Sequence, residues 1–245
     1  LECGYHGWRY DSEGICREVP ALCKNKEAFA RRVQAFPTQE QQGFVWVFPS
    51  SEPPTGQPFQ IQHFDDARYT RVHYQCDFEA SLYSTLENIL DVPHTAFLHR
   101  GLFRGVKANR ISAVLRRFSR HVEAEYIGEP RPQGVIGRVL APQGGNVKHF
   151  DRFYLPSIAQ VEYGLGAKSH ILINDILTPV EDFLTRMHSV VVFRLPVATA
   201  VVGRVIRPFA ERVLKQDAKI LKIQTATVKS FSREQFVSTE VDLLG

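Results

Sequence analysis

The chain has 245 residues, of which 44% are hydrophobic and 23% are charged, and its formal net charge is +4. This length and composition suit one large or two modest globular domains with a buried core. The mild charge argues against a dedicated nucleic-acid-binding protein, which usually shows a dense basic stripe, but leaves room for docking an acidic protein partner. No apolar run reaches the length of a membrane span.

The cysteines and the start of the chain bear on its origin. Four cysteines are too few and too scattered for a disulfide scaffold, which favours a reducing, cytoplasmic compartment; they are Cys3, Cys16, Cys23 and Cys76. The start carries no signal-peptide pattern. Because the sequence begins at Leu1 without a Met, in what reads as a strand-to-loop transition, we expect it to be truncated at the N-terminus.

The sequence pattern in the first fifth of the chain predicts a small β domain. Residues 1–50 contain short β segments and turns, including an aromatic and β-branched strand over 44–48. Residues 49–58 are rich in Pro, with Gly, Ser and Thr, which is typical of a linker. We therefore expect a partial domain over 1–50, a linker over 51–65 and a second domain over 66–245.

For the second domain, the order of the expected strands and helices predicts an α+β fold. A strand is expected over 69–78 and a helix, free of Gly and Pro, over 80–90. Further segments favour an antiparallel sheet, and their connections carry Gly and Pro; they are 111–127, 150–163, 170–177 and 187–195. Apolar residues at helical spacing predict a long helix over 206–231.

Cys3 and His6 lie three residues apart on a Gly-containing loop, which is a spacing used by metal ligands. The simpler interpretation is a buried Cys and a surface His. With Gly7, Trp8 and the turn that follows, however, the loop resembles the second ligand loop of Rieske ferredoxin domains. Such domains hold a [2Fe–2S] cluster with two Cys on one iron and two His on the other. The resemblance implies that Cys3 and His6 are half of the cluster ligands, and the partner Cys-x-His loop is absent from the sequence.

The strongest pattern is Asp91, His94 and His99. Two His and a carboxylate are the donors of non-haem Fe(II) sites that leave coordination positions open for oxygen. Five residues of a regular helix rotate by about 500°, so His94 and His99 would point about 140° apart. A helix break, for which Pro93 is suited, would bring them together. The alternative is a helix capped by Asp91 with two surface histidines.

The spacing Asp-x2-His-x4-His, preceded by Glu87 and Asn88, closely resembles the mononuclear iron motif of Rieske oxygenase catalytic domains. By this resemblance His94 and His99 are iron ligands. Asp91 would instead bridge to the Rieske His of a neighbouring subunit, giving electrons a short path to the iron. The position of Asn88, three residues before the acid, is similar to the monooxygenase-like branches.

The third ligand is expected on the late helix, where Asp217 opens a segment similar to the family pattern D-x2-(I/L)-(L/M)-x2-Q. Gln216 stands where many members carry Glu, a difference that we regard as minor. The alternative is a solvated Asp217 paired with Lys215 or Lys219. Other candidate carboxylates remain; they are Glu211, Asp182 and Asp175.

The resemblance is to the α subunits of aromatic-ring-hydroxylating oxygenases, and it covers residues 3–224. It implies the C-terminal half of a Rieske β domain followed by a helix-grip (START-like) catalytic domain with a large antiparallel sheet. Such an enzyme uses O2, and electrons relayed from a Rieske cluster to mononuclear Fe(II), to hydroxylate, demethylate or dihydroxylate a hydrophobic, aromatic substrate, as in aromatic compound catabolism. A ferredoxin or flavin reductase as electron donor and a homotrimer are also implied.

Two other functions are weighed against the oxygenase. One is a non-catalytic helix-grip carrier of apolar ligands, against which the His94/His99 pair argues. The other is a Rieske electron-transfer protein, which has no use for the long segment after the linker.

Overall fold

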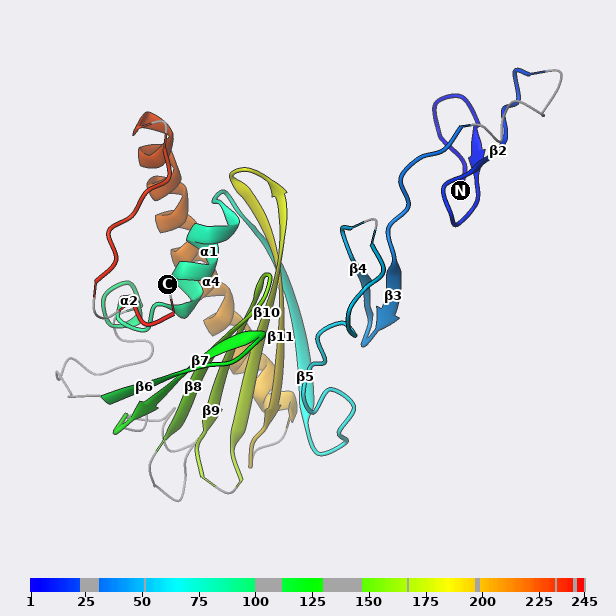
Figure 1. Ribbon diagram of the computed structural model, residues 1–245. Helices are drawn as coiled ribbons and strands as arrows, with labels where there is room; N and C mark the ends of the chain where they lie inside the picture. Colours follow the sequence, from blue (N-terminus) through cyan, green and yellow to red (C-terminus); the bar gives the residue numbers. More distant parts are fainter. Residues whose placement is uncertain are drawn as a thin grey trace. The chain divides into compact units, whose positions relative to one another are not determined.

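The computed structural model describes most of the chain and divides it into two compact units, Leu1–Ile61 and Gln62–Gly245 (Figure 1). The boundary falls inside residues 51–65, while the division into 1–50, 51–65 and 66–245 stays a prediction. Side chains of residues 96 and 199–206 are not described. The described residues are 1–22, 31–50, 52–99, 112–129, 147–166, 168–196, 199–231, 233–239 and 242–244.

The first unit contains two short antiparallel strand pairs. They are β1 (Arg9–Tyr10) with β2 (Cys16–Glu18), and β3 (Thr38–Gln41) with β4 (Phe44–Val47). Gln42 and Gly43 alone connect β3 to β4, and both have positive φ angles, of 53° and 79°. Positive φ at both positions is the geometry of a type I′ turn, whose twist matches that of the flanking strands. The short β segments expected over residues 1–50 are thus present.

The second unit is built on a seven-stranded antiparallel sheet with the strand order β5-β11-β10-β9-β8-β7-β6. The strands are β5 (Thr70–Phe78), β6 (Ser112–Arg117), β7 (His121–Ile127), β8 (Lys148–Tyr154), β9 (Ile158–Gly164), β10 (His170–Glu181) and β11 (Leu184–Arg194). The predicted α+β fold is confirmed, with one correction. The segments 111–127 and 150–163 are not continuous: within the described residues, each forms a hairpin of two strands, because the chain turns at residues 118–120 and 155–157.

The described residues of this unit form three helices, which are α1 (Leu82–Leu90), α2 (His94–Phe97) and α4 (Thr199–Phe231). The Ser81 side chain caps α1 by accepting a hydrogen bond of 3.0 Å from the Ser84 backbone N–H. α1 and α4 lie over the same face of the sheet (Figure 1). Although α4 has 33 residues, no helix in the described part of the chain is long and apolar enough to cross a membrane.

The core of the second unit lies between these helices and the sheet. Leu86 and Leu90 of α1 meet Leu221 of α4 over residues of four strands. The buried strand and loop residues of this cluster are Phe78, Ala80, Ala159, Leu177 and Met187. Burial of each large apolar side chain contributes roughly 1.5–3 kcal/mol. This cluster holds the C-terminal end of α1 beside the middle of α4.

The C-terminal segment returns to α1. The Glu234 carboxylate accepts hydrogen bonds from the hydroxyls of Ser81 and Ser84 at the start of that helix. Phe236 stacks on Tyr83 with ring centroids 6.0 Å apart. α1 is thus fixed from two sides, by the core and by this segment.

A buried ionic cluster lies on the helix-facing side of the sheet. The His149 ring is hydrogen bonded through Nδ1 to Glu129, at 2.5 Å, and through Nε2 to Asp151, at 2.9 Å. The ring is stacked between Tyr126 and Tyr163. Burial lowers the pKa of His149, but the hydrogen bonds to the two carboxylates outweigh it and raise this pKa to about 9.

The core contact of α4 predicts a large effect of one substitution. Leu221 is 2% exposed, whereas its neighbour Ile220 is 42% exposed. Leu221→Ala should lower the free energy of unfolding by about 3 kcal/mol, because it leaves a cavity between α4, α1 and the sheet. Ile220→Ala should cost less than about 1 kcal/mol. Urea unfolding monitored by circular dichroism measures both, and equal losses would contradict this packing.

The His149 cluster predicts a pH dependence of stability. The pKa of His149 is raised from 6.5 in the unfolded chain to about 9 in the fold. The stabilisation, roughly 3 kcal/mol, is therefore fully present below about pH 6.5 and is lost as the pH rises through about 9. Urea unfolding at pH 6 and pH 9 should show this loss in the parent and not in His149→Gln. The same pH dependence in both proteins would refute the charged imidazole.

Candidate metal centre

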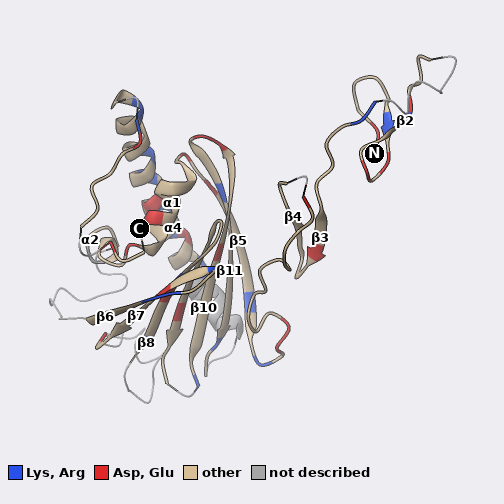
Figure 2. Ribbon diagram, in the orientation of Figure 1, with Lys and Arg blue, Asp and Glu red and all other residues tan. Residues whose placement is uncertain are grey.

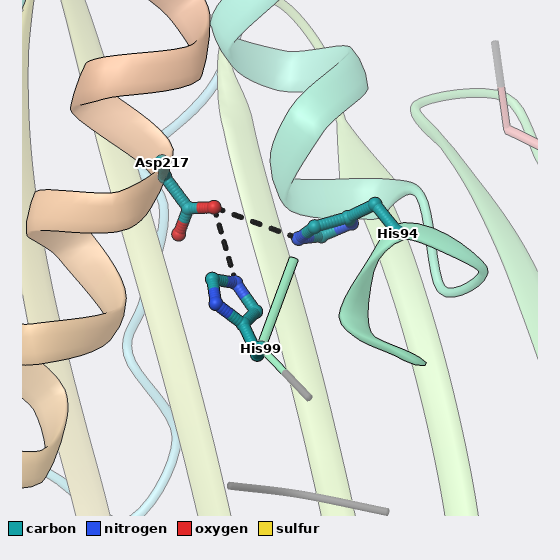
Figure 3. A group of neighbouring side chains, drawn as sticks. All are labelled: His94, His99 and Asp217. Atoms are coloured by element: carbon teal, nitrogen blue, oxygen red, sulfur yellow. Dashed lines mark ion pairs between the residues drawn. The ribbon is translucent and has the colours of Figure 1, made fainter. Parts of the chain in front are cut away.

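Three side chains from two parts of the second unit converge between α4, which carries Asp217, and the segment after α1, which carries His94 and His99. Nε2 of His99 lies 3.1 Å, and Nε2 of His94 lies 3.7 Å, from the same carboxylate oxygen, Oδ1 of Asp217 (Figure 3). One atom of each residue can be chosen so that all lie within 4.8 Å of one another. In the described part of the chain, this is the one group of three or more His, Cys, Asp or Glu with metal-ligand spacing.

The helix α1 ends before the first histidine, and the short helix α2 ends before the second. α1 ends at Leu90, and Asp91 adopts an extended conformation (φ −80°, ψ 97°). The one-turn helix α2 starts at His94, directly after Pro93, and ends before His99. Neither histidine therefore follows the phase of α1, and their rings lie 5.1 Å apart at 76°. The alternative of an Asp91-capped helix with two surface histidines is wrong, since His99 is 1% exposed.

Hydrogen bonds fix which nitrogen of each ring faces Asp217. Nδ1 of His94 donates to the backbone carbonyl of Asp91, and Nδ1 of His99 donates to Oε1 of Gln216, at 2.9 Å. A carbonyl oxygen can only accept a hydrogen bond, so Nδ1 of each ring is the donor and Nε2 of each ring is the atom that faces Asp217. The role of Gln216 was missed from the sequence, where its difference from Glu was regarded as minor.

The Asp217 side chain is 10% exposed. Its Oδ1 is buried and accepts no hydrogen bond from any described residue. Burial raises the pKa of Asp217, while the charges of His99 and His94 and hydrogen bonds from Asn88 and His99 oppose this rise. Two imidazole nitrogens and a carboxylate oxygen about 3–4 Å apart are a donor set that a divalent cation can bind, and the cation would offset the charge of the carboxylate. The residues thus fit a bound divalent metal ion.

Asp91 lies on the other side of the His94 ring. Its Oδ2 is 3.8 Å from Nδ1 of His94, so it faces away from Nε2, as expected for a residue that is not a ligand. The residue is half-buried, and burial raises its pKa, which His94 opposes and Asp242 increases. Asn88 and Asp91 both support the three side chains from the end of α1.

The competing carboxylates behave differently from Asp217. Glu211 is exposed and pairs with Arg207 at 3.0 Å. Asp182 is exposed at the β10–β11 turn, and Asp175 is buried in β10, outside the group of three. The alternative of a solvated Asp217 is wrong, because the side chain is buried against the histidines.

Cys3 and His6 lie in the first unit, in a loop closed by hydrogen bonds from Cys3 N to Trp8 O, of 2.8 Å, and from Gly7 N to Cys3 O, of 2.9 Å. Both side chains are exposed, and the Cys3 thiol is free. Cys3 and His6 are two of the four donors that a [2Fe–2S] cluster needs. The thiols of Cys16 and Cys76 are also free, and Cys23 lies outside the described residues.

Comparison with known families identifies the chain. The family model for the vanillate O-demethylase oxygenase C-terminal domain matches residues 78–245. The chain belongs to this family, and the expected membership of the Rieske non-haem iron oxygenases is confirmed. The match includes every residue of the candidate metal centre.

Two curated relatives and one solved structure agree. The chain is 32% identical over 106 residues to methylxanthine N1-demethylase NdmA of Pseudomonas putida, covering 41% of this chain and 29% of that protein. It is 31% identical over 106 residues to the vanillate O-demethylase oxygenase subunit of Pseudomonas sp. (strain ATCC 19151), covering 40% and 30%. The matches thus span less than a third of these relatives. Dicamba monooxygenase bound to dicamba shares the fold, with a TM-score of 0.80 at 18% identity over 100% of this chain and 75% of that one.

The hydrogen bond from His99 to Gln216 predicts an effect on metal affinity. Gln216→Leu should weaken binding of Co(II) or Fe(II) by about 10–100-fold, because the His99 ring loses the acceptor that orients it. Gln216→Glu should retain binding, and the exposed neighbour Lys215→Leu serves as the control. Titration followed by the cobalt absorption bands measures the affinities. Unchanged affinity in Gln216→Leu would show that the bond does not orient the ligand.

Proposed function

We propose that this chain is the catalytic part of a Rieske-type oxygenase that uses O2 to hydroxylate, demethylate or dihydroxylate a hydrophobic, aromatic substrate. The observation that carries the proposal is the convergence of three buried or partly buried donor atoms: the Nε2 atoms of His94 and His99 lie 3.7 and 3.1 Å from Oδ1 of Asp217. His94, His99 and Asp217 are the proposed ligands of a mononuclear Fe(II) ion. Two His and one carboxylate are the donors that favour this ion and leave other positions open.

Iron bound in this way supplies the redox chemistry with O2, and the protein supplies orientation and a dry environment. The chain's own residues prepare the ligands. Asp91 and Gln216 hold the two rings with Nε2 inward, and Asn88 holds the Asp217 carboxylate. Asn88 and Asp91 are therefore proposed to position the ligands, and Asp91 is in addition the proposed bridge to a neighbouring subunit.

Cys3 and His6 are the proposed ligands to the two irons of a Rieske [2Fe–2S] cluster. They are half of the required set, so the residues of this chain alone define no electron path from a cluster to the metal centre. The proposal takes a ferredoxin or flavin reductase as the electron source and a homotrimer as the assembly. Exposed Arg212, Lys215 and Lys219 on α4 offer positive charge to an acidic donor.

The proposed substrate class rests on the names of the relatives. Names of the relatives include a methylxanthine demethylase, a vanillate demethylase and a dicamba monooxygenase, all of which act on aromatic or heteroaromatic compounds. We extend this class to the chain. A cytoplasmic location is proposed from the sparse, free cysteines.

The test begins with the metal centre. The chain is loaded anaerobically with one equivalent of Fe(II), treated with nitric oxide and studied by EPR. A high-spin iron–nitrosyl signal is expected in the parent and should vanish in His94→Ala/His99→Ala, because these rings supply two of three ligands.

A matched control is available in the sheet. His73 and His188 form another histidine pair, 3.2 Å apart, on β5 and β11, so His73→Ala/His188→Ala should keep the signal. No signal in well-folded parent protein would overturn the iron site and favour a carrier of apolar ligands, for which a screen for bound lipids is the next measurement.

A further inference from the structure

Asp175 is a buried acidic residue of β10 that the proposed metal centre does not use. In the sheet it pairs with Ala159 of β9 on one side and with Ser189 of β11 on the other. Ala159 belongs to the core cluster formed with α1 and α4, so this row of residues points toward the helices. Asp175 therefore lies on the face of the sheet over which Asp217 is held.

The Asp175 carboxylate is incompletely satisfied. The residue is 6% exposed, and Ser189 donates a hydrogen bond to it. Its Oδ1 is buried and has no hydrogen-bond partner among the described residues. Burial raises the pKa of Asp175 to about 6, against the Ser189 hydrogen bond and with a contribution from Asp217. An unpartnered charged oxygen in a protein interior is costly and needs an explanation.

The neighbours of Asp175 on this face are apolar. Val161, Ile173 and Val191 form the next row across three strands. They are only half-buried, whereas Leu172, on the opposite face, is 0% exposed. Apolar side chains that are incompletely covered, beside one unsatisfied polar atom, are the usual composition of a small-molecule site.

Asp175 and Asp217 are two acidic groups that influence each other in this part of the unit. Asp217 acts on the pKa of Asp175. Cys76, on β5 and separated from β10 by β11, has a pKa raised by burial and by the carboxylates of Asp175, Asp77 and Asp217. Figure 2 shows acidic residues both in the sheet and in the helices α1 and α4 that lie over it. A bound metal ion would offset the charge of Asp217. It would still leave Oδ1 of Asp175 without a hydrogen-bond donor among the described residues.

We propose that Asp175 is a specificity-determining residue of the oxygenase, whose free carboxylate oxygen accepts a hydrogen bond from an O–H, N–H or ammonium group on an apolar, aromatic substrate. The inference rests on the proposed function and narrows its substrate class. A substrate that turns a carboxylate toward the sheet is rejected, because two buried negative charges would meet without a donor between them.

The test uses three ligands that share a methoxyphenyl body: 4-methoxybenzylamine, 4-methoxybenzyl alcohol and 4-methoxybenzoate. Isothermal titration calorimetry on the full chain without metal should show the amine and the alcohol binding at least about tenfold more tightly than the benzoate. Asp175→Asn, which keeps the size of the side chain, should reduce this preference by about tenfold or more. Asp182→Asn, at an exposed position in the same hairpin, should leave it unchanged.

A second measurement separates a ligand-binding role from a structural one. Without ligand, Asp175→Asn should raise the thermal unfolding midpoint by a few degrees, because it removes an unsatisfied buried charge. A lowered midpoint would show that Asp175 stabilises the fold, and the proposal would be wrong. It would also be overturned by an unchanged preference in Asp175→Asn, or by parent protein that binds neither the amine nor the alcohol at 10 mM. Since no iron is used, failure of the iron–nitrosyl test leaves this result independent.

Discussion

The contact between α4 and α1, which pack together on one face of the sheet, is the interaction on which the candidate metal centre depends. Leu221 packs with Leu86 and Leu90, and Asp217 lies one turn earlier on the same helix. The same packing holds the end of α1, from which the chain leads directly to His94 and His99. An apolar contact thus sets the distance between ligands that come from segments more than a hundred residues apart.

Buried charge is handled in three ways within one unit. The His149 imidazolium is paired with two carboxylates, so its charge is compensated by the fold itself. Asp217 faces the Nε2 atoms of His94 and His99, which together with its carboxylate form the proposed site of a cation. Asp175 keeps one oxygen without a donor among the described residues. The first arrangement stabilises the folded state, whereas we propose that the other two are compensated by a bound metal ion and by a substrate.

Much of this could be predicted from the sequence, because local patterns carried it. A helix irregularity near His94 and His99 was expected from their angular mismatch; the structure has a break before both residues and the end of α2, at Phe97, between them. The late helix offered Asp217 at a spacing typical of the family. Contacts set by strand register could not be predicted. The pairing of Asp175 with Ser189, and of His149 with Asp151 and Glu129, depends on which strands are neighbours, and no local period reports that. Hairpin turns inside long apolar runs were missed for a related reason, since the runs read as continuous strands.

The proposed ligands come from two segments of the chain, the residues after α1 and the helix α4. Metal binding would therefore affect how long the folded protein persists. A metal ion bound to His94, His99 and Asp217 joins the segment after α1 to α4, and it binds the folded chain far better than the unfolded one. By mass action, free ion at a hundred times its dissociation constant adds about 2.7 kcal/mol to the free energy of unfolding. Under iron limitation the same polypeptide would open more often at this junction and be degraded sooner. Its abundance in the cell would then follow iron supply without any change in synthesis.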